Sequence, residues 1–426
     1  MRRVLLLAVL TILLAACAGP GASDAPPPAH DPPTAFGPSS GSVLRSSTGV
    51  LPGSYGSRPE LPVALDGTTV WLAESGGLTR ADSTGAAAAV GLPPGRWVDG
   101  APLPVPGAGL VLAASSSVVP GSGTRPPGLA VELLAVPRVQ AGDPVPGVAW
   151  TAAAPLPWSA DPKSVRTRVV GVAAAGDGAR VAVLTASTST RRGTVAVDLG
   201  SRRVLWAADG VLAGAVLDGR TTQGEPVPGA TLPGEPLAVG AAIPPGGGAG
   251  YSPSEVVGLD VLTGARRTVT DQGSTALSVH RAGPSTVTVA GRRPTSAKAF
   301  LTVYDAGGGV RNEVDLGTAS APPECRWDEA ATAVCSGSNR AFALDAPTGA
   351  QLWSLPAGGR VAPAVSGAWH GAVYGTTVNG PVVVDARTGL DRNPAPGAAP
   401  VVVNAYLGVG PGTGLLSGVV LTPATG

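Results

Sequence analysis

The sequence predicts an all-β protein assembled from repeated small antiparallel sheets, and three observations lead to this prediction. Glycine and proline, with 62 and 44 copies, together make up about a quarter of the 426 residues. At this density they would interrupt a helix every few residues, each time at a cost in stability, which excludes a mainly helical protein. Hydrophobic residues reach 44%, enough to bury a core. Finally, a strand-and-turn pattern recurs along most of the chain.

Residues 1–16 have the composition of an export signal. The first three residues, Met-Arg-Arg, carry two basic side chains, and Val4–Leu14 is an apolar stretch too short for a permanent transmembrane helix. Leu14–Cys17 reads Leu-Ala-Ala-Cys, which resembles the bacterial lipoprotein lipobox. The resemblance implies that Cys17 is lipidated, becomes the new N-terminus and holds the protein on the outer face of the cell membrane. The alternative is ordinary secretion with an incidental cysteine.

Residues 17–41 are expected to form a flexible linker after the lipidated Cys17. They contain many prolines and glycines but only one aromatic residue, so they cannot bury enough apolar surface to fold. His30 is expected to be solvated here. Residues 37–41, GPSSG, match the G-x-S-x-G pattern of hydrolases by chance, because no strand precedes them and no helix follows.

Residues 42–426 carry a repeat whose clearest copies are Ala341–Gly349 and Val382–Gly389. Each copy is an apolar strand followed by a turn in which Asp caps the backbone and Gly supplies a positive φ. Weaker copies occur at residues 79–85, 132–136, 195–200, 258–264, 302–305 and 421–426. Because the aspartates recur at one turn position, we interpret them as turn caps rather than catalytic acids: Asp82, Asp198, Asp260, Asp305, Asp345 and Asp385.

Each unit extends on both sides of its turn. Another strand lies upstream. Trp206 and Trp353 each follow the turn aspartate by eight residues on an expected outer strand, where the ring is predicted to cover the joint to the next unit. A small antiparallel sheet every 40 residues or so is typical of a propeller blade. Eight turns predict a single eight-bladed β-propeller over residues 42–426, with seven blades if the degenerate second unit is an insertion. Ser42–Leu51 would supply the last outer strand and close the ring.

The blade motif resembles the repeat of pyrroloquinoline-quinone-type propellers. Ala343–Gly349 followed by Trp353 matches that motif closely, while Asn393 replaces the tryptophan in the next copy. The family includes propeller lipoproteins of outer-membrane assembly and actinobacterial lipoproteins. The resemblance implies a non-catalytic binding scaffold, or alternatively a quinone-dependent oxidoreductase. Because adjacent cysteines and a calcium-ligand cluster are both missing, we expect no cofactor and no enzymatic activity.

Cys325 and Cys335 are expected to form a structural disulfide. They flank a predicted Asp-Glu turn between two strands, and the exported compartment is oxidising. A metal site or a redox pair is the alternative. However, zinc would need two more ligands, and His280 and His370 lack motif spacing. Both histidines are expected to be buried, and no metal site is predicted.

Charge and loop length suggest the kind of partner. A formal net charge of +1 gives no basic excess for nucleic acid. The predicted loops between second and third strands are long in four consecutive units, and they carry the candidate binding residues Arg125, Arg191, Arg192, Arg292, Arg293 and Lys298. Guanidinium groups there could engage carboxylates or phosphates of an envelope protein or polymer, with the turn aspartates at the opposite face. Solubilising loops, or a sensor paired with a signalling protein, are the alternatives; a monomer is expected.

Overall fold

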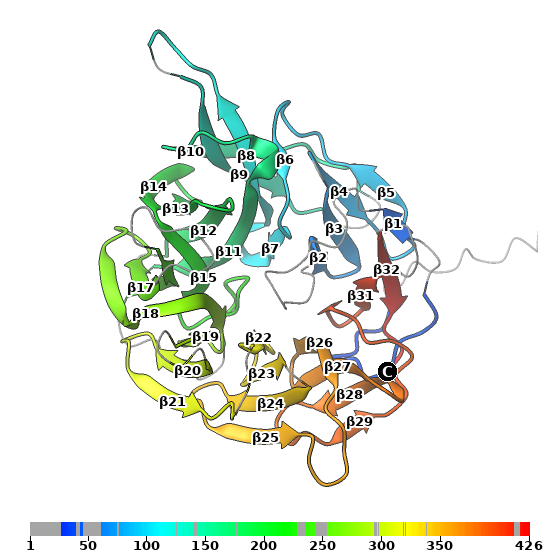
Figure 1. Cartoon of the computed structure of the whole chain (residues 1–426). Helices are drawn as coiled ribbons and strands as arrows, with labels where there is room; N and C mark the ends of the chain where they lie inside the picture. The colour runs from blue at the N-terminus through cyan, green and yellow to red at the C-terminus, as the bar shows by residue number, and fades with distance from the viewer. Residues whose placement is uncertain are drawn as a thin grey trace, which may run out of the picture.

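The chain folds as a β-propeller in which sheets surround one axis (Figure 1). The computed structural model describes residues 27–39, 43–45, 61–74, 76–124, 126–139, 143–175, 178–227, 230, 235–243, 254–293, 296, 298–317, 319, 321–337, 339–412 and 418–426. Cys17 and Arg125 lie outside these ranges, so lipidation at Cys17 and the position of Arg125 stay predictions. Within the described part of the chain, no helix is long and apolar enough to cross a membrane.

The strands follow the chain in antiparallel groups. The first two sheets contain β2 (Val63–Asp66), β3 (Thr69–Glu74), β4 (Gly77–Ala81) and β5 (Ala87–Ala89), then β6 (Trp97–Val98), β7 (Leu103–Val105), β8 (Leu110–Val119), β9 (Gly128–Pro137) and β10 (Trp150–Leu156). The third contains β11 (Arg166–Ala174), β12 (Arg180–Ser187), β13 (Arg192–Asp198) and β14 (Arg203–Asp209). Two short 3-10 helices, η2 (Pro106–Ala108) and η3 (Pro162–Ser164), lie between strands.

A seven-stranded sheet comes next and consists of β15 (Val211–Leu217), β16 (Leu237–Ala242), β17 (Ser254–Asp260), β18 (Arg266–Arg281), β19 (Thr286–Arg292), β20 (Ala299–Asp305) and β21 (Val310–Val314). It is followed by β22 (Glu324–Trp327), β23 (Thr332–Gly337), β24 (Arg340–Asp345) and β25 (Gln351–Leu355), then by β26 (Ala364–Trp369), β27 (Ala372–Thr377), β28 (Gly380–Asp385) and β29 (Asp391–Asn393). The last sheet joins β30 (Val402–Val403), β31 (Leu407–Pro411) and β32 (Gly418–Pro423) to β1 (Val43–Arg45).

The sheets follow one another in chain order around the axis, and the ring closes (Figure 1). Each innermost strand contacts the next, in the order β2, β7, β11, β15, β18, β22, β26 and β30, and β30 contacts β2. β18 is 16 residues long because it is the outer strand of one group and the inner strand of the next. Where β15 passes β18, a Cβ at Gly214 would lie 2.0 Å from the Val279 carbonyl oxygen, so only glycine fits there.

The predicted closing strand is confirmed for Val43–Arg45, which pair antiparallel with Val420, Val419 and Gly418 of β32. Residues 46–51 of that prediction lie outside the described part of the chain. Because the N-terminal strand completes a sheet formed by the C-terminal strands, the two ends of the chain are joined within one sheet and the ring is closed at this joint.

Tryptophans cover the joints between neighbouring sheets, as predicted. Trp353 of β25 donates Nε1–H to the Ala386 carbonyl at 2.8 Å, and Trp206 of β14 donates to Val261 at 2.9 Å. Both rings lie over the turn glycine of the following unit: a Cβ on Gly389 would lie 2.8 Å from Trp353. Such a position excludes any side chain, which explains why the turn motif ends in glycine.

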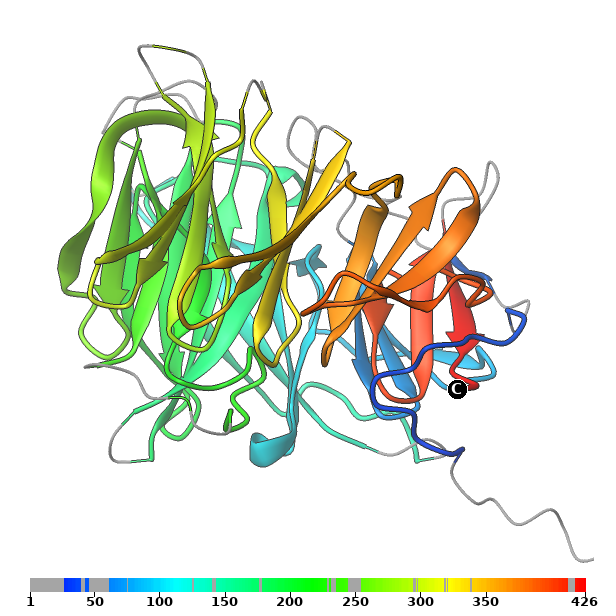
Figure 2. The ribbon, with the colours of Figure 1, turned by 90° about the horizontal axis from the view of Figure 1, so that it is seen from below.

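The two ends of the sheets form different faces. The turn face carries the connections from first to second and from third to fourth strand, and therefore all the aspartate turns; the loop face carries those from second to third strand. In the side view, η2 marks the turn face at the bottom of the wheel (Figure 2). This alternation follows from antiparallel order, because consecutive connections lie at opposite ends of a sheet.

Residues 27–39, here named the N-terminal strap, correct the prediction of an unpacked linker. Phe36 is buried and packs edge-on against Tyr374 at 5.7 Å between ring centroids. The strap also forms backbone hydrogen bonds to residues 396, 405, 423, 425 and 426. Composition suggested a spacer because the segment has few apolar residues, but here one aromatic side chain and the backbone provide the contacts.

Candidate functional site

The repeated aspartates are turn caps, as interpreted from the sequence. Asp385 accepts hydrogen bonds from the Thr388 N–H at 2.8 Å and the Thr388 hydroxyl at 2.9 Å, and Asp260 and Thr263 repeat this arrangement. Burial alone would raise the pKa of Asp385, but hydrogen bonds from Arg392 and Thr388 outweigh it and lower the pKa. A carboxylate held ionised by its own turn is poorly suited to act as a general acid.

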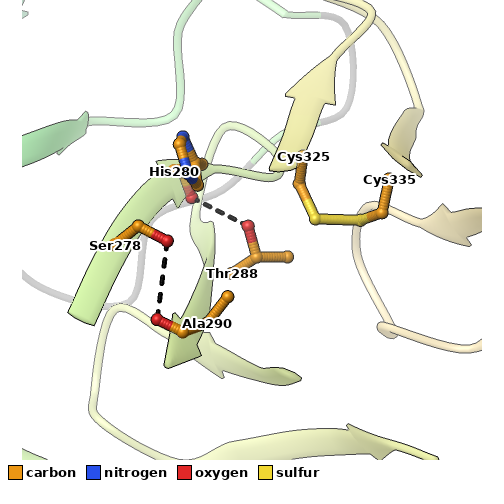
Figure 3. The surroundings of a disulfide bond; sticks show 6 residues. All are labelled: Ser278, His280, Thr288, Ala290, Cys325 and Cys335. Atoms are coloured by element: carbon orange, nitrogen blue, oxygen red, sulfur yellow. Dashed lines mark hydrogen bonds between the residues drawn. A yellow bond between two sulfur atoms is a disulfide. The ribbon is translucent and has the colours of Figure 1, made fainter. Parts of the chain in front are cut away.

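The predicted disulfide between Cys325 and Cys335 is present. The two residues are direct cross-strand partners on β22 and β23, with an S–S distance of 2.04 Å, and both are buried (Figure 3). His280 of β18 lies on the neighbouring sheet in the same view, and its carbonyl accepts a hydrogen bond from the Thr288 hydroxyl at 3.3 Å. His280 is half-buried, so the prediction of a buried histidine holds only in part.

His370 is not buried, which corrects its prediction. It occupies the turn between β26 and β27 with a φ of 42°, and its ring stacks on Trp369. Its Nδ1 lies 2.7 Å from the Asp31 carboxylate, and Trp369 Nε1–H donates to the same carboxylate at 3.0 Å. The histidine therefore holds the N-terminal strap at the turn face. Its sequence position next to a strand did not reveal this role.

A polar cluster missed by the sequence analysis lies at the ends of inner strands on the turn face. This axial cluster consists of Asp218 after β15, Arg281 at the end of β18, Glu329 after β22, and Thr222. Arg281 Nη2 lies 3.4 Å from Asp218 Oδ1, and their side chains are 8% and 0% exposed. Burial raises the pKa of Asp218 and lowers that of Arg281, because desolvation disfavours both charged forms.

Further contacts offset that desolvation. Asp218 accepts hydrogen bonds from the Ala174 and Arg220 N–H groups, both at 3.1 Å. The Arg281 guanidinium donates to the Arg220 and Gly283 carbonyls and lies 4.9 Å from the centroid of Trp327. A buried ion pair of this kind adds little net stability, but loss of one partner is costly because the other charge is then buried without compensation. Here it fixes three successive inner strands relative to one another.

Thr222 extends the cluster across the axis. Its N–H and hydroxyl donate to the Glu329 carboxylate at 3.0 and 2.7 Å, and its carbonyl accepts from Val172 N–H at 3.4 Å. Val172 belongs to β11 and Glu329 follows β22, with two inner strands between them around the ring. Residues 218–226, here named the axial loop, therefore lie over the turn-face end of the axis. The only sequence signal was the long stretch between Leu217 and Leu237.

Glu329 adopts an unusual backbone conformation to make this contact. Its φ is 59°, in the left-handed region that costs a non-glycine residue about 1 kcal/mol or more. The equivalent turn after β2 places glycine, Gly67, at a φ of 57°. Glu329 and His370 thus both have a positive φ in a turn, and the side chain of each holds a distant segment. Glu329 holds the axial loop, and His370 holds the strap.

The predicted binding arginines lie toward the loop face but are accompanied by acidic partners. Arg191 Nη1 lies 3.8 Å from Asp209 Oδ2, and Arg293 Nη2 lies 3.5 Å from Glu313 Oε1. Burial lowers the pKa of Arg192, which is less accessible than its neighbour. Arg292 is half-buried and Lys298 exposed. The loop face therefore carries acidic as well as basic side chains around the predicted arginines.

Two further features bear on ligand binding. An open groove lies between β21 and the β24–β25 hairpin, lined by Asn312, Glu313, Asp315, Arg340 and Gln351, among others. Arg340 crosses it by donating to the Asp315 carbonyl at 2.8 Å and to Gln351 Oε1 at 3.2 Å. Among the described residues, no group of three or more His, Cys, Asp or Glu side chains is arranged to hold a metal ion.

No protein-family model and no curated protein matches the chain. Solved structures that resemble it include the Dos1 propeller, at 13% identity and a TM-score of 0.48 over 74% of each chain. A hydrazine synthase of Kuenenia stuttgartiensis shows 12% identity and a TM-score of 0.39, covering 86% of this chain and 99% of the other. The AfRom2 CNH domain shows 8% identity and a TM-score of 0.38, covering 75% and 92%. These similarities assign no activity or ligand to this chain.

Proposed function

We propose that this protein is a non-catalytic binding or scaffold module, anchored by lipid on Cys17 to the outer face of the cell membrane. One observation carries the proposal: the two faces of the propeller differ. The axial loop and the strap cover part of the turn face, whereas the loop face carries exposed hairpins with cationic side chains. Binding residues on rigid scaffolds are commonly found on such loops.

We infer that the propeller has eight blades of the pyrroloquinoline-quinone-repeat type. The cycle of innermost strands from β2 to β30 supports this count, with β18 serving two blades. The second unit has its own sheet, β6–β10, which argues against treating it as an insertion. The repeat assignment is supported by the Asp caps and by tryptophans seated over turn glycines.

The use of the acidic side chains supports a binding role over catalysis. The six repeated aspartates accept hydrogen bonds within their own turns. Asp218 and Glu329 hold the axial cluster together, and Asp328 accepts backbone hydrogen bonds from Ala330, Thr332 and Gly371. Carboxylates that already accept hydrogen bonds within the fold are poor candidates for proton transfer to or from a substrate.

The loop face favours a partner that presents carboxylates or phosphates, in an envelope protein or polymer. Arg191 and Arg293 have side chains that are 58% and 42% exposed. Their ion pairs with Asp209 and Glu313 are long and exposed, so they contribute little energy. A ligand anion that offers bidentate geometry could displace these intramolecular partners at small cost.

The test is photo-crosslinking in intact cells with a crosslinker at Val378, which is 90% exposed on the loop face. One variant replaces Arg191, Arg292 and Arg293 with Ser and leaves Arg192 unchanged, because burial lowers the pKa of the Arg192 guanidinium. The matched control replaces three exposed arginines near the turn aspartates, Arg203, Arg311 and Arg387. We expect at least a fivefold loss of the crosslinked species in the first variant only. Equal yields in both would overturn the loop-face assignment.

The anchor is tested separately. Replacing Cys17 with Ser should abolish incorporation of radiolabelled palmitate and release the protein from the membrane fraction. Retention on washed membranes without lipid attachment would contradict anchoring through Cys17.

A further inference from the structure

The N-terminal strap enters the propeller at the turn face. Its Asp31 is held by Trp369 and His370, which form the turn at the end of β26. His30 N–H donates to the Ala405 carbonyl at 2.8 Å, in the neighbouring turn before β31. In the side view the strap, in blue, begins at the end of the wheel marked by η2 and then rises along its side (Figure 2).

The strap is firmly held because it contacts the strands that close the ring. The Tyr374 hydroxyl donates to the Pro33 carbonyl at 2.9 Å, and Phe36 is 6% exposed. Phe36 forms an antiparallel bridge with Ala424, and β1 continues the same pairing along β32. Releasing the strap would therefore expose Phe36 and remove hydrogen bonds at the joint between the first and last parts of the chain.

The distance from the strap to Cys17 limits how the propeller can lie on a membrane. Ten residue steps separate Cys17 from residue 27, so even a fully extended chain spans at most about 36 Å. A six-residue strand such as β28 is about 20 Å long, and the outer connections add to the height of the wheel. Bringing the loop face to the bilayer would thus require the segment between Cys17 and residue 27 to be almost fully extended around the rim of the wheel.

We propose that the strap orients the propeller with its turn face toward the lipid surface and its loop face away from it. This inference rests on the proposed lipid anchor at Cys17. The interaction surface is the turn face near β26–β32, and its partner is the bilayer that holds the anchor. The loop face, with Arg191, Arg292 and Arg293, is then presented to the envelope rather than to lipid headgroups.

The test compares two probes in the same sheet. Val378, 90% exposed, lies between β27 and β28 at the loop face, and Leu390, 62% exposed, lies between β28 and β29 at the turn face. Each is replaced by Cys in the full lipidated chain and labelled with one fluorophore. Cys325 and Cys335 do not react because they form a buried disulfide. The labelled proteins are reconstituted into phosphatidylcholine and phosphatidylglycerol vesicles with and without nitroxide headgroup lipid.

We expect the Leu390→Cys probe to be quenched at least twice as strongly as the Val378→Cys probe. Equal quenching, or stronger quenching at position 378, would overturn the orientation. A Cys17→Ser chain that still binds vesicles would instead contradict the anchor, so the two proposals fail in distinguishable ways.

A second variant tests whether the strap sets this orientation. Asp31→Ala combined with Tyr374→Phe removes the contacts to Trp369, His370 and Pro33 while leaving Phe36 and β1 in place. We expect this variant to keep its lipid and its circular dichroism spectrum, while the quenching ratio of the two probes falls toward one. An unchanged ratio would show that the strap does not orient the propeller.

Discussion

The connections at the two ends of the strands differ in length and in packing. At the turn face, six third strands are joined to their fourth strands by short turns that an aspartate caps, and the clearest of these turns pack under a neighbouring tryptophan. The connection between β9 and β10, residues 138–149, is a longer exception. At the loop face, the connection is tight at Val378–Asn379 but spans residues 243–253 between β16 and β17. This difference shows that packing at a joint between sheets, rather than strand formation, limits the length of a connection. Loops that do not pack at a joint can change length at little cost in stability.

The largest effect is expected from breaking a packed turn. Gly389→Ala would place a Cβ 2.8 Å from Trp353 at a φ of 72°. We expect the free energy of unfolding to fall by about 3 kcal/mol, from steric overlap plus left-handed strain. Chemical denaturation monitored by tryptophan fluorescence measures this loss.

Gly359 is the matched control, because it has a similar φ of 77° but nothing within 4 Å of a Cβ. Gly359→Ala should cost only about 1 kcal/mol, the strain alone. Equal costs at the two positions would mean that the tryptophan joint does not determine the turn motif.

The disulfide joins β22 to β23 within one sheet, so removing it measures the stability of the sheet rather than that of either face. Replacing Cys325 and Cys335 together with Ala should lower the free energy of unfolding by about 2–3 kcal/mol, mainly because the unfolded chain gains freedom. Denaturant titrations of the variant and of reduced wild type should agree. No change in either would show that the bond is not formed in the exported protein.

An insertion compares the two ends directly. Gly-Ser-Gly-Ser placed between Val378 and Asn379 should cost less than about 1 kcal/mol. The same insert between Pro347 and Thr348 should cost about 2 kcal/mol, because it breaks the Thr348 bonds to Asp345 and the Asn312 bond to the Gly349 carbonyl. Thermal unfolding reports the order, and a reversed order would contradict the comparison.

The smallest effect concerns pH. Since the pKa of Asp385 is lowered in the folded state, its carboxylate stabilises the protein above the unfolded pKa of about 4 and loses this effect as pH falls through the folded value. Asp385→Asn should cost about 1 kcal/mol at pH 7, and the difference from wild type should shrink below pH 4. Unfolding curves between pH 7 and pH 2.5 provide the measurement; a difference that grows in acid would reverse the assigned shift.

Much of the fold could be predicted from local patterns. The aspartate turns, the tryptophan joints and the pairing of Cys325 with Cys335 each involve residues within one unit or at one repeated joint. The closing strand was also predicted correctly for Val43–Arg45. The strap was wrongly predicted as an unpacked linker and His370 as buried, because their contacts join residues 339 positions apart.

The sequence by itself determined the repeated unit, its turn chemistry and its disulfide, because each arises from short-range periodicity or from residues on adjacent strands. Only the tertiary structure decided which distant segments meet at the axis and the rim. Thr222 reaches Glu329 across 107 positions, and Asp218 meets Arg281 across 63. Such contacts have no periodic signature, since closing the ring brings strand ends together irrespective of their distance along the chain.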